Sequence, residues 1–425
     1  MTGCIFNIVL NWGEKSRYYR ITASYRLPRV ATIKHLIERI LSIILAAGLI
    51  LTVATYYLAT KPQANAFPTY LSGLAFLPLC LYPARLSSIA SNPVIRLGSA
   101  LILYLVLTTV WSETASIKTT SLYFGFALLL LAFVAGIVFC ADTWPTFLNW
   151  IITIIILAAA VSALYSIYLF YALDYHPLDE KDRLYALGRI HNPAIGAFSY
   201  GIALVFATTR LVYRTRMDER IGWGIATLTL LYAVMMTDTR SAWVGLLAAA
   251  VSAIAFSGSL ALRARLVSSA ALVALAAIAL FIGLHSDFRD EIMRRSTSFR
   301  PEIWSATLHK FSGAMWLVGD GANAPSFVND GRFTFDHPHS IYVATLFYGG
   351  AIGMVLLLVV ITAAYRALLR SRTGELRTMA LAGLTFGAIG LLFDGDHLLD
   401  KIDYVWMVLW FPITLAACQS SSLQH

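Results

Sequence analysis

Arginine side chains concentrate in the polar segments between apolar stretches of the chain. Arg183 and Arg189 precede one apolar stretch, and Arg240 begins another in the segment DTRSAW. A longer polar segment, residues 285–339, adds Arg289, Arg294, Arg295, Arg300 and Arg332. A planar guanidinium makes bidentate, charge-assisted hydrogen bonds to phosphate. The set therefore predicts a ligand that bears phosphate or pyrophosphate, although each arginine alone could instead pair with a carboxylate or reach lipid headgroups.

Two histidines lie in the segment FDHPHS, directly before another apolar stretch. A neutral imidazole accepts a proton from a hydroxyl at physiological pH, so His337 and His339 are candidate general bases. Asp336 could orient one of the rings, and Ser340 is a candidate N-cap for the helix that follows. The alternative is a pair of interfacial histidines without a chemical role, and their spacing does not choose between the two.

Carboxylates and a further histidine follow in the segment FDGDH. Asp394, Asp396 and His397 could bind a divalent cation through oxygen ligands, or a zinc ion together with the earlier histidines. Nothing in the spacing enforces either geometry. The alternative is a hydrated turn whose carboxylates pair with Arg300 or Lys401. We favour this second interpretation and predict neither a metal nor another cofactor.

The composition around these residues is that of an integral membrane protein. Of 425 residues, 58% are hydrophobic and only 13% are charged, and the mean hydropathy is +0.70. A soluble chain carries about 25% charged residues, and a single core stops growing near about 250–300 residues. Apolar runs of about 20 residues, enough to cross a bilayer core of about 30 Å, recur along the chain. The sequence therefore predicts an all-α, polytopic membrane protein.

The apolar runs predict about twelve transmembrane helices. They cover roughly 37–59, 66–83, 95–112, 121–140, 147–172, 193–213, 221–237, 241–258, 265–284, 340–365, 377–394 and 403–418. Lysine and arginine gather at the ends of these runs on one side, which places both termini in the cytoplasm. The same bias accounts for the net charge of +9, so we predict no nucleic-acid partner. The four cysteines, Cys4, Cys80, Cys140 and Cys418, then lie near the reducing side, and no disulfide is expected.

This topology divides the chain into five parts. They are a basic cytoplasmic tail (1–35), nine helices (36–284) with an extracytoplasmic loop at 173–192, a long extracytoplasmic loop (285–339), three helices (340–418) and a short cytoplasmic tail (419–425). The long loop contains RPEIWSATLHKFSGAMWLVGDG, whose apolar side includes Trp304 and predicts an amphipathic helix at the membrane interface. Few ionisable residues lie inside the spans, which disfavours a secondary transporter. No nucleotide-binding, serine-hydrolase or zinc-protease motif is present.

Four segments, taken in order, resemble one bacterial family. DTRSAWVGLL, SFRPEIWSATL, WLVGDGAN and HPHSIYVATLFYGGAIG resemble the ordered signature of O-antigen ligases and polymerases, along residues 237–355. One departure is Asp238-Thr239, where the family often has a serine before the arginine. Protein-glycosylating members look longer at the C-terminus, so the chain is more similar to the ligases.

The resemblance implies a GT-C-like membrane fold with a long periplasmic loop, in the bacterial inner membrane. It implies an inverting, metal-independent glycosyltransferase that moves O-antigen from undecaprenyl pyrophosphate onto the lipid A–core oligosaccharide. Membrane lipids are expected as further partners. His339 aligns with the family's histidine and His337 competes with it as the base. Arg300 and Arg189 would stabilise the leaving pyrophosphate. Further substrate contacts are expected from Arg240, Arg183, Arg295, Arg332, Asp394 and Trp304.

Two other functions stay open at this point. An O-antigen polymerase of the same family would bind two pyrophosphate-linked glycans rather than one glycan and one lipid A–core. A channel or carrier for an anion would use the same arginines without chemistry.

Overall fold

The computed structural model describes residues 28–59, 83–177, 183–258, 261–268, 270, 300–325, 328–329, 334–335 and 337–421. The chain divides into two units, Met1–Ile40 and Leu41–His425. Of the first unit, only the beginning of the first helix is described, and the exposed Arg39 and Ile40 close it. Several predictions lie outside the described residues: Arg295, Arg332 and Asp336, Cys4 and Cys80, the span 66–83 except its last residue, and most of the span 265–284.

The predicted apolar runs that fall within the described residues are helical. They form α1 (Pro28–Leu58), α4 (Pro93–Thr108), α5 (Ile117–Thr143), α6 (Phe147–Ala172), α7 (Pro193–Tyr213), α8 (Met217–Met236), α9 (Arg240–Ala255), α14 (Ile341–Arg370), α15 (Glu375–Gly390) and the π-helix η3 (Trp406–Trp410) with α16 (Phe411–Ser421). Between them lie α3 (Pro83–Ser91), the 3-10 helix η2 (Gly188–Ile190), α12 (Arg300–His309) and α13 (Met315–Val318). Within the described residues, strand structure is limited to β1 (Val328–Asn329) and β2 (Thr334–Phe335), which pair antiparallel. The all-α prediction is confirmed.

Five described helices are long and apolar enough to cross a membrane: Arg39–Leu58, α5, α6, α7 and α14. The number rises to six if α3 and α4, which meet at 85°, count as one broken span. Shorter apolar helices are Arg240–Ala255 and Trp406–Ser420. The chain is thus a polytopic membrane protein, while the total of about twelve spans stays a prediction.

Polar residues fix where the long helices begin. Asn92 and Asn192 each accept a hydrogen bond from the backbone N–H two residues later, at 3.0 and 2.8 Å, and each is followed by a proline at the first helical position. This pairing satisfies an otherwise free N–H and sets φ for the first turn. Ser340 caps α14 in the same way, accepting from its first turn at 3.4 Å, as predicted.

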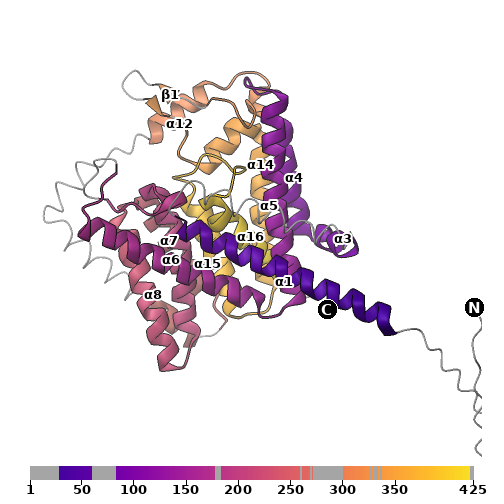
Figure 1. Ribbon diagram of the computed structural model, residues 1–425. Helices are drawn as coiled ribbons and strands as arrows, with labels where there is room; N and C mark the ends of the chain where they lie inside the picture. Colours follow the sequence, from indigo (N-terminus) through magenta and orange to yellow (C-terminus); the bar gives the residue numbers. More distant parts are fainter. Residues whose placement is uncertain are drawn as a thin grey trace, which may run out of the picture. The chain divides into compact units, whose positions relative to one another are not determined.

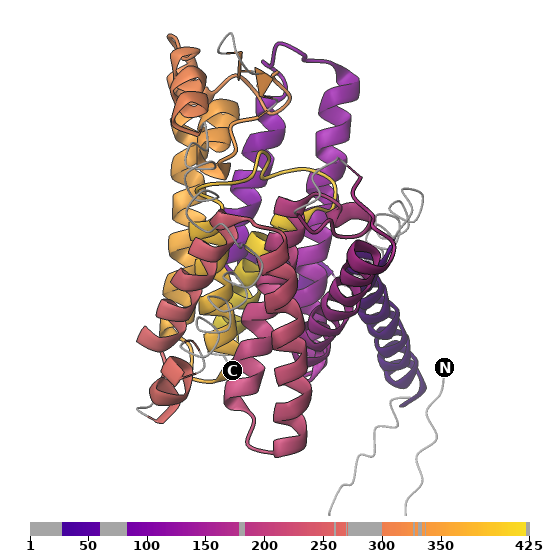
Figure 2. The ribbon, with the colours of Figure 1, turned by 90° about the vertical axis from the view of Figure 1, so that its left-hand side faces the viewer.

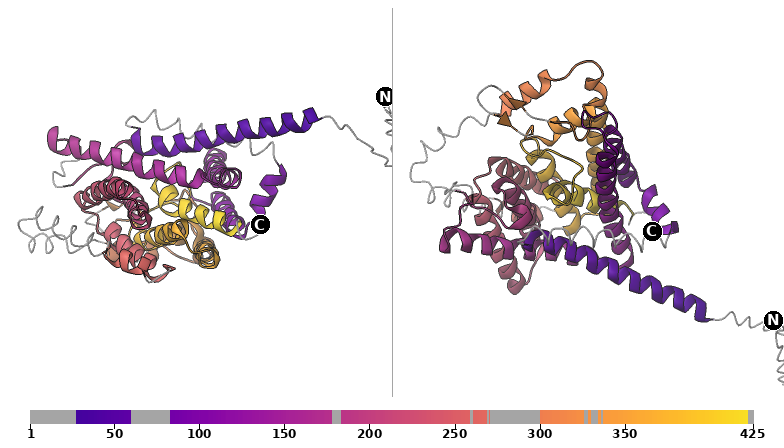
Figure 3. Two further views of the ribbon diagram at one scale, coloured as in Figure 1. Left: turned by 90° about the horizontal axis from the view of Figure 1, so that it is seen from below. Right: turned by 45° about the horizontal axis from the view of Figure 1, so that its top comes forward.

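The helices of the second unit pack around α16 and the tryptophans that precede it. α16 contacts α4, α5, α14 and α15, and Figure 3 shows it in yellow among the other helices. Trp406 and Trp410 are fully buried at its start. α15 packs closely on α9, where a Cβ added to Gly245 would lie 3.0 Å from the ring of Phe386. Figure 1 shows α4 beside α14, and α5 packs on α4.

α14 is bent where the chain returns from the long loop. Gly350 has φ 61° and ψ −165°, a conformation that disfavours any residue with a side chain. At the bend, two backbone carbonyls of α14 accept hydrogen bonds from the turn that follows α13. The N–H of Asp320 donates to the carbonyl of Phe347 (2.8 Å), and the N–H of Gly321 donates to that of Tyr348 (3.0 Å). The bend therefore anchors the turn against the first half of α14.

The segment predicted as one amphipathic helix over 300–321 forms the two short helices α12 and α13. The turn between them contains Gly313 at φ +47°, a left-handed conformation that an α-helix does not contain. Figure 2 shows α12 near the end of α14 at which that helix begins. Trp316 and Leu317 are exposed, which suits side chains at a membrane interface.

Candidate active site

The loop between α15 and η3, residues 391–405, gathers buried charge, and we call it the acidic loop. It carries Asp394, Asp396, Asp400 and Asp403. The N–H of Ile341 lies within hydrogen-bond distance of two carbonyls of this loop, Leu391 (3.0 Å) and Asp394 (2.9 Å). The acidic loop is thus fastened to the first residue of α14, directly after the two histidines.

His337 and His339 face each other at the entrance to α14. Their ring centroids lie 4.0 Å apart with the planes at 48°. His339 has φ +50°, which is uncommon for a residue with a side chain and persists only where the surroundings enforce it. Burial, followed by His337 and Arg300, lowers the pKa of His339 to about 4, and Asp396 opposes this shift. The ring of His339 is therefore neutral at pH 7 and able to accept a proton.

Arg300, the first residue of α12, reaches across to the acidic loop. Its Nε donates to the backbone carbonyl of Phe393 at 2.8 Å. Burial lowers the pKa of Arg300 most, the charge of Asp394 raises it, and the charge of Arg240 lowers it. Arg240, at the start of α9, thus lies within electrostatic range of Arg300. An arginine stays protonated despite such shifts, so Arg300 has a carboxylate, Asp394, and a second cation, Arg240, within electrostatic range.

Trp304 joins the three segments that make this site. It lies one turn after Arg300, and its indole N–H donates to the carbonyl of Pro338 between the histidines, at 3.0 Å. Its ring stacks on Phe393 of the acidic loop, with centroids 6.4 Å apart and planes at 24°. Trp304 therefore positions α12 against the histidines and the acidic loop.

Asp394 is the most enclosed carboxylate of the site. It accepts from the N–H of Gly395 at 2.7 Å and from the hydroxyl of Tyr404 at 3.4 Å. Burial raises the pKa of Asp394, and the Gly395 hydrogen bond, Arg300, His337 and Tyr404 oppose it in that order. Asp394 thus lies between a cation and an imidazole, where it can hold either in place.

Asp396 and His397 pair with each other. Asp396 Oδ1 lies 2.9 Å from His397 Nδ1, and the His397 ring stacks on Tyr348 at a centroid distance of 4.6 Å. Burial alone would raise the pKa of Asp396, but the hydrogen bond with His397 and nearby imidazoles outweigh it and lower it to about 2. Burial would lower the pKa of His397, but Asp396 and then Asp400 raise it. The Asp-x-Asp-His segment therefore forms an internal ion pair. No cluster of three or more possible metal ligands occurs among the described histidine, cysteine, aspartate and glutamate residues.

Arg189 approaches the acidic loop at its other end. Its Nη1 donates to the carbonyl of Ile402 at 2.7 Å. Burial lowers the pKa of Arg189, and Tyr56, Asp403 and Asp400 act in the opposite direction. Arg300 binds the loop at Phe393 instead. The two predicted leaving-group arginines therefore lie at opposite ends of the same loop.

Arg183 supports the turn that precedes α9. Its Nε donates to the carbonyl of Thr237 at 2.9 Å, and its Nη2 donates to Thr239 Oγ1 at 3.4 Å. Asp238 between them has φ +47°. These contacts hold the turn from which Arg240 extends. Arg183 therefore supports the backbone before Arg240.

Two contributors to the site were not predicted from the sequence. Tyr348 supports His397 from within α14. Asp403 caps the helix that leads into η3, accepting from the N–H groups of Val405 (2.9 Å) and Trp406 (3.4 Å), and burial raises its pKa. The density of aspartates in FDGDHLLDKID could have indicated the loop, since buried carboxylates in so apolar a chain need partners. Nothing in the sequence indicated Tyr348.

Comparison with known proteins finds a family whose sequence model matches this part of the chain. The family described as O-antigen ligase matches residues 225–358, from α8 to the middle of α14. The match contains both histidines, Arg240, Arg300 and Trp304, and it confirms the resemblance predicted from residues 237–355.

A relative extends the similarity beyond that segment. The O-antigen ligase of Pseudomonas aeruginosa strain PAO1 is 27% identical over 402 residues, which are 91% of this chain and 93% of the relative. An alignment that covers this share of the chain includes the arginines before α7. The similarity to O-antigen ligases over both comparisons supports a role in attaching O-antigen to lipopolysaccharide, a reaction of glycosyl transfer.

Proposed function

We propose that this protein transfers O-antigen from undecaprenyl pyrophosphate to the lipid A–core oligosaccharide at the periplasmic face of the bacterial inner membrane, with both termini in the cytoplasm. One observation carries the proposal. Within the matched segment, a neutral His339 lies in electrostatic range of Arg300. Arg300 in turn lies in electrostatic range of Arg240 and of Asp394 in the acidic loop. A proton acceptor next to converging cations suits attack of a hydroxyl on a phosphate-linked sugar.

The acceptor hydroxyl loses its proton to a histidine in this mechanism. His339 is our first choice because its ring is neutral and because Arg300, which helps to lower its pKa, is the cation proposed to meet the donor. A bound pyrophosphate would offset the charge of Arg300 and raise the pKa of His339 toward neutral pH, where a general base works best. His337 is the competing choice. The attack proceeds opposite the leaving group and inverts the anomeric centre.

Cationic side chains stabilise the leaving pyrophosphate. Its negative charge grows as the sugar–phosphate bond breaks, so an arginine aimed at it acts most strongly in the transition state. Arg300 and Arg240 supply this charge at one end of the acidic loop. Arg189 supplies it at the other end, where it would meet the donor only if the pyrophosphate or its glycan extends along the loop.

The remaining predicted contacts complete the proposal. Trp304 offers an aromatic face to a sugar beside the histidines, and Asp394 holds Arg300 and His337. Arg183 acts through the turn before α9, while Arg295 and Arg332 keep their predicted role as donor contacts in the long loop. No step requires a metal, because the arginines provide the charge that a divalent cation would otherwise supply.

Reconstituted transfer tests the proposed function. Purified protein is mixed with lipid A–core and an undecaprenyl-pyrophosphate-linked glycan in the presence of EDTA, and the glycosylated lipid is resolved by electrophoresis and mass spectrometry. We expect product that depends on both substrates. Glycan elongation without lipid A–core would identify a polymerase, anion flux in liposomes without transfer would identify a channel, and activity that returns only with Mg²⁺ would refute the metal-free mechanism.

A further inference from the structure

A groove runs along the half of α14 that lies away from the histidines. It has a volume of about 690 Å³ and lies between α4 and α14, with Ser420 of α16 at one end. The end of α14 that borders it is the one predicted to be cytoplasmic. The groove is thus separate from the candidate active site, and what occupies it is independent of the proposed transfer reaction.

Most of the groove is apolar. Val355, Leu358 and Val359 line it from α14, and their side chains are 57%, 48% and 40% exposed. Leu97 lines it from α4. An exposed apolar strip on a helix long enough to cross a membrane faces hydrocarbon rather than water. From Val355 to the end of α14 the strip rises about 22 Å, more than the depth of one hydrocarbon leaflet, about 15 Å.

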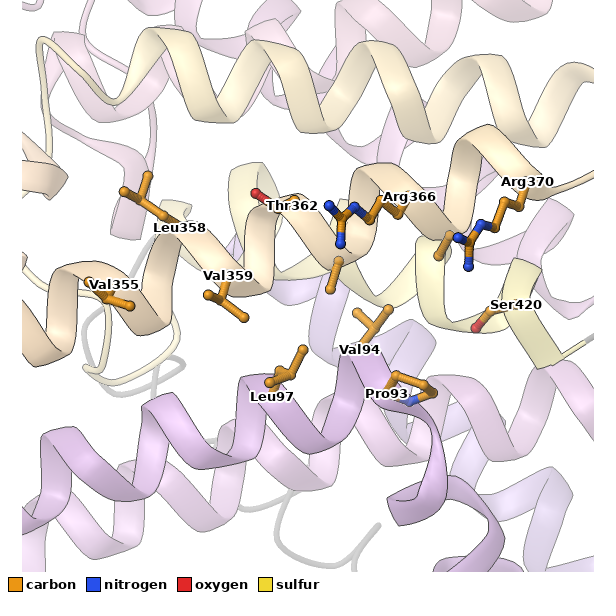
Figure 4. Close-up of a pocket in the computed structure, with 12 residues that line it drawn as sticks. Pro93, Val94, Leu97, Val355, Leu358, Val359, Thr362, Arg366, Arg370 and Ser420 are labelled. Carbon is orange, nitrogen blue, oxygen red and sulfur yellow. The ribbon is translucent and has the colours of Figure 1, made fainter.

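Two arginines close the groove at the membrane surface. Arg366 and Arg370 lie one turn apart on α14, and Figure 4 shows both guanidinium groups directed toward the side where Pro93, Val94 and Ser420 lie. Within the part of the chain that the structure describes, neither arginine has an ion pair or a hydrogen bond. Like charges at this spacing repel each other, so an anion between them would be stabilising.

We infer that the groove binds one anionic phospholipid, with its phosphate between Arg366 and Arg370 and an acyl chain along α14 toward Val355. Charge complementarity selects the headgroup, since two guanidinium groups match a phosphodiester. The apolar strip selects a lipid over a soluble anion. A general excess of positive charge on the cytoplasmic side would explain exposed arginines, but it requires neither a groove nor its alignment with them.

Retention of lipid by the full-length protein tests this inference. The protein is purified in detergent, exposed to equal amounts of phosphatidylglycerol and phosphatidylcholine, and analysed by native mass spectrometry. We expect one phosphatidylglycerol to be retained with a preference of about tenfold or more, as two surface arginines near an anionic lipid allow. The double variant R366Q/R370Q should lose this preference. The matched control R263Q/R265Q removes two exposed arginines elsewhere and should keep it.

A second variant tests the apolar half without changing charge. Val355→Trp fills the far end of the groove at an exposed position, and it should weaken retention of both lipids while glycerol phosphate still fails to displace them. Equal retention of the two lipids by the unaltered protein would overturn the inference. So would an unchanged preference in R366Q/R370Q, or displacement by glycerol phosphate, which would show that the arginines bind a soluble anion.

Discussion

His339 combines two properties that rarely occur together at one residue. Its backbone is left-handed at φ +50°, and its ring is held neutral by burial and by its neighbours His337 and Arg300. The first is a local cost that Ser340 and the acidic loop sustain by fixing the start of α14. The second makes the ring a proton acceptor. Strain and a shifted pKa at the same residue favour a chemical role over a merely interfacial one.

Alanine substitutions should separate the two histidines. His339→Ala should lower kcat by about 10²–10⁴, the contribution typical of a general base. His337→Ala should lower kcat less, because it removes only a neighbour of His339. The matched control is His309→Ala on α12, whose exposed ring bonds to its own helix at Ser305. Equal activity of all three variants in the transfer assay would remove histidine from the mechanism.

The pH dependence follows from the sign of the His339 shift. A base acts in its unprotonated form, and kcat/KM reports the pKa of the free enzyme. Because that pKa is lowered to about 4 in the free enzyme, kcat/KM for the lipid-linked donor should persist as the pH falls from 7 to 5.5 and decline only on approach to 4. An ordinary histidine would already lose activity near pH 6.5. An acid limb at that higher pH would show that another group is the base.

The helices contribute to the candidate active site mainly through their first residues and through the bend in α14. The site is built from the beginnings of α9, α12 and α14 and from the loop after α15, so each reactive side chain is held by a helix terminus. The bend at Gly350 allows the turn after α13 to bond to α14, and this turn is where the long loop returns to the bundle. The packing of the turn after α13 on α14 therefore depends on the backbone at this bend.

Substitution of the bend glycine should be costly. Gly350→Ala places a Cβ against Leu317 and Gly319 at a positive φ, so we expect a loss of roughly 1–3 kcal/mol in stability and reduced transfer. Gly222→Ala in α8 is the matched control, since its Cβ would meet nothing within 4 Å. Thermal unfolding in detergent measures both. If the two variants unfold at the same temperature, the bend is not required.

A buried ion pair joins α7 to α15 at the other end of the bundle. Arg210 Nη1 lies 2.9 Å from Glu375 Oε1, with the arginine side chain only 4% exposed. Glu375→Gln would leave that cation unpaired, and removal of one partner of a buried pair costs up to about 3–5 kcal/mol, less here because Glu375 is partly solvated. The unfolding temperature of Glu375→Gln in detergent should fall. Asp218→Asn, which breaks an exposed pair with Arg216, should shift it little.

At the scale of the whole molecule, the sequence predicted the helices far better than their mutual placement. Apolar runs gave the bounds of α6 and α7 without error, because a membrane span needs only length and hydrophobicity. The break after His309 was missed, since Gly313 was not recognised as a helix end. The histidines and Arg300 were brought together as expected. The structure places Arg189 at the other end of the acidic loop. The sequence could not predict this position, because contacts between distant segments leave no local pattern.

The role of Trp304 shows the same limit. Its spacing indicated an apolar face of an amphipathic helix, whereas its indole N–H and ring connect Pro338 with Phe393. Such a connection depends on three segments that lie far apart in the chain. No periodicity within any one of them reveals it, so only a three-dimensional structure distinguishes a supporting tryptophan from an interfacial one.

That connection also sets an order for biogenesis. During synthesis, the histidines and α12 emerge from the ribosome before the acidic loop, and the loop must follow α15 into the membrane before Trp304 has both partners. A nascent chain halted before residue 391 would display the histidines with neither Asp394 nor the carbonyl that Arg300 requires. The centre is therefore completed only when the final helices insert, and partially inserted chains lack the groups that would act on a lipid-linked glycan.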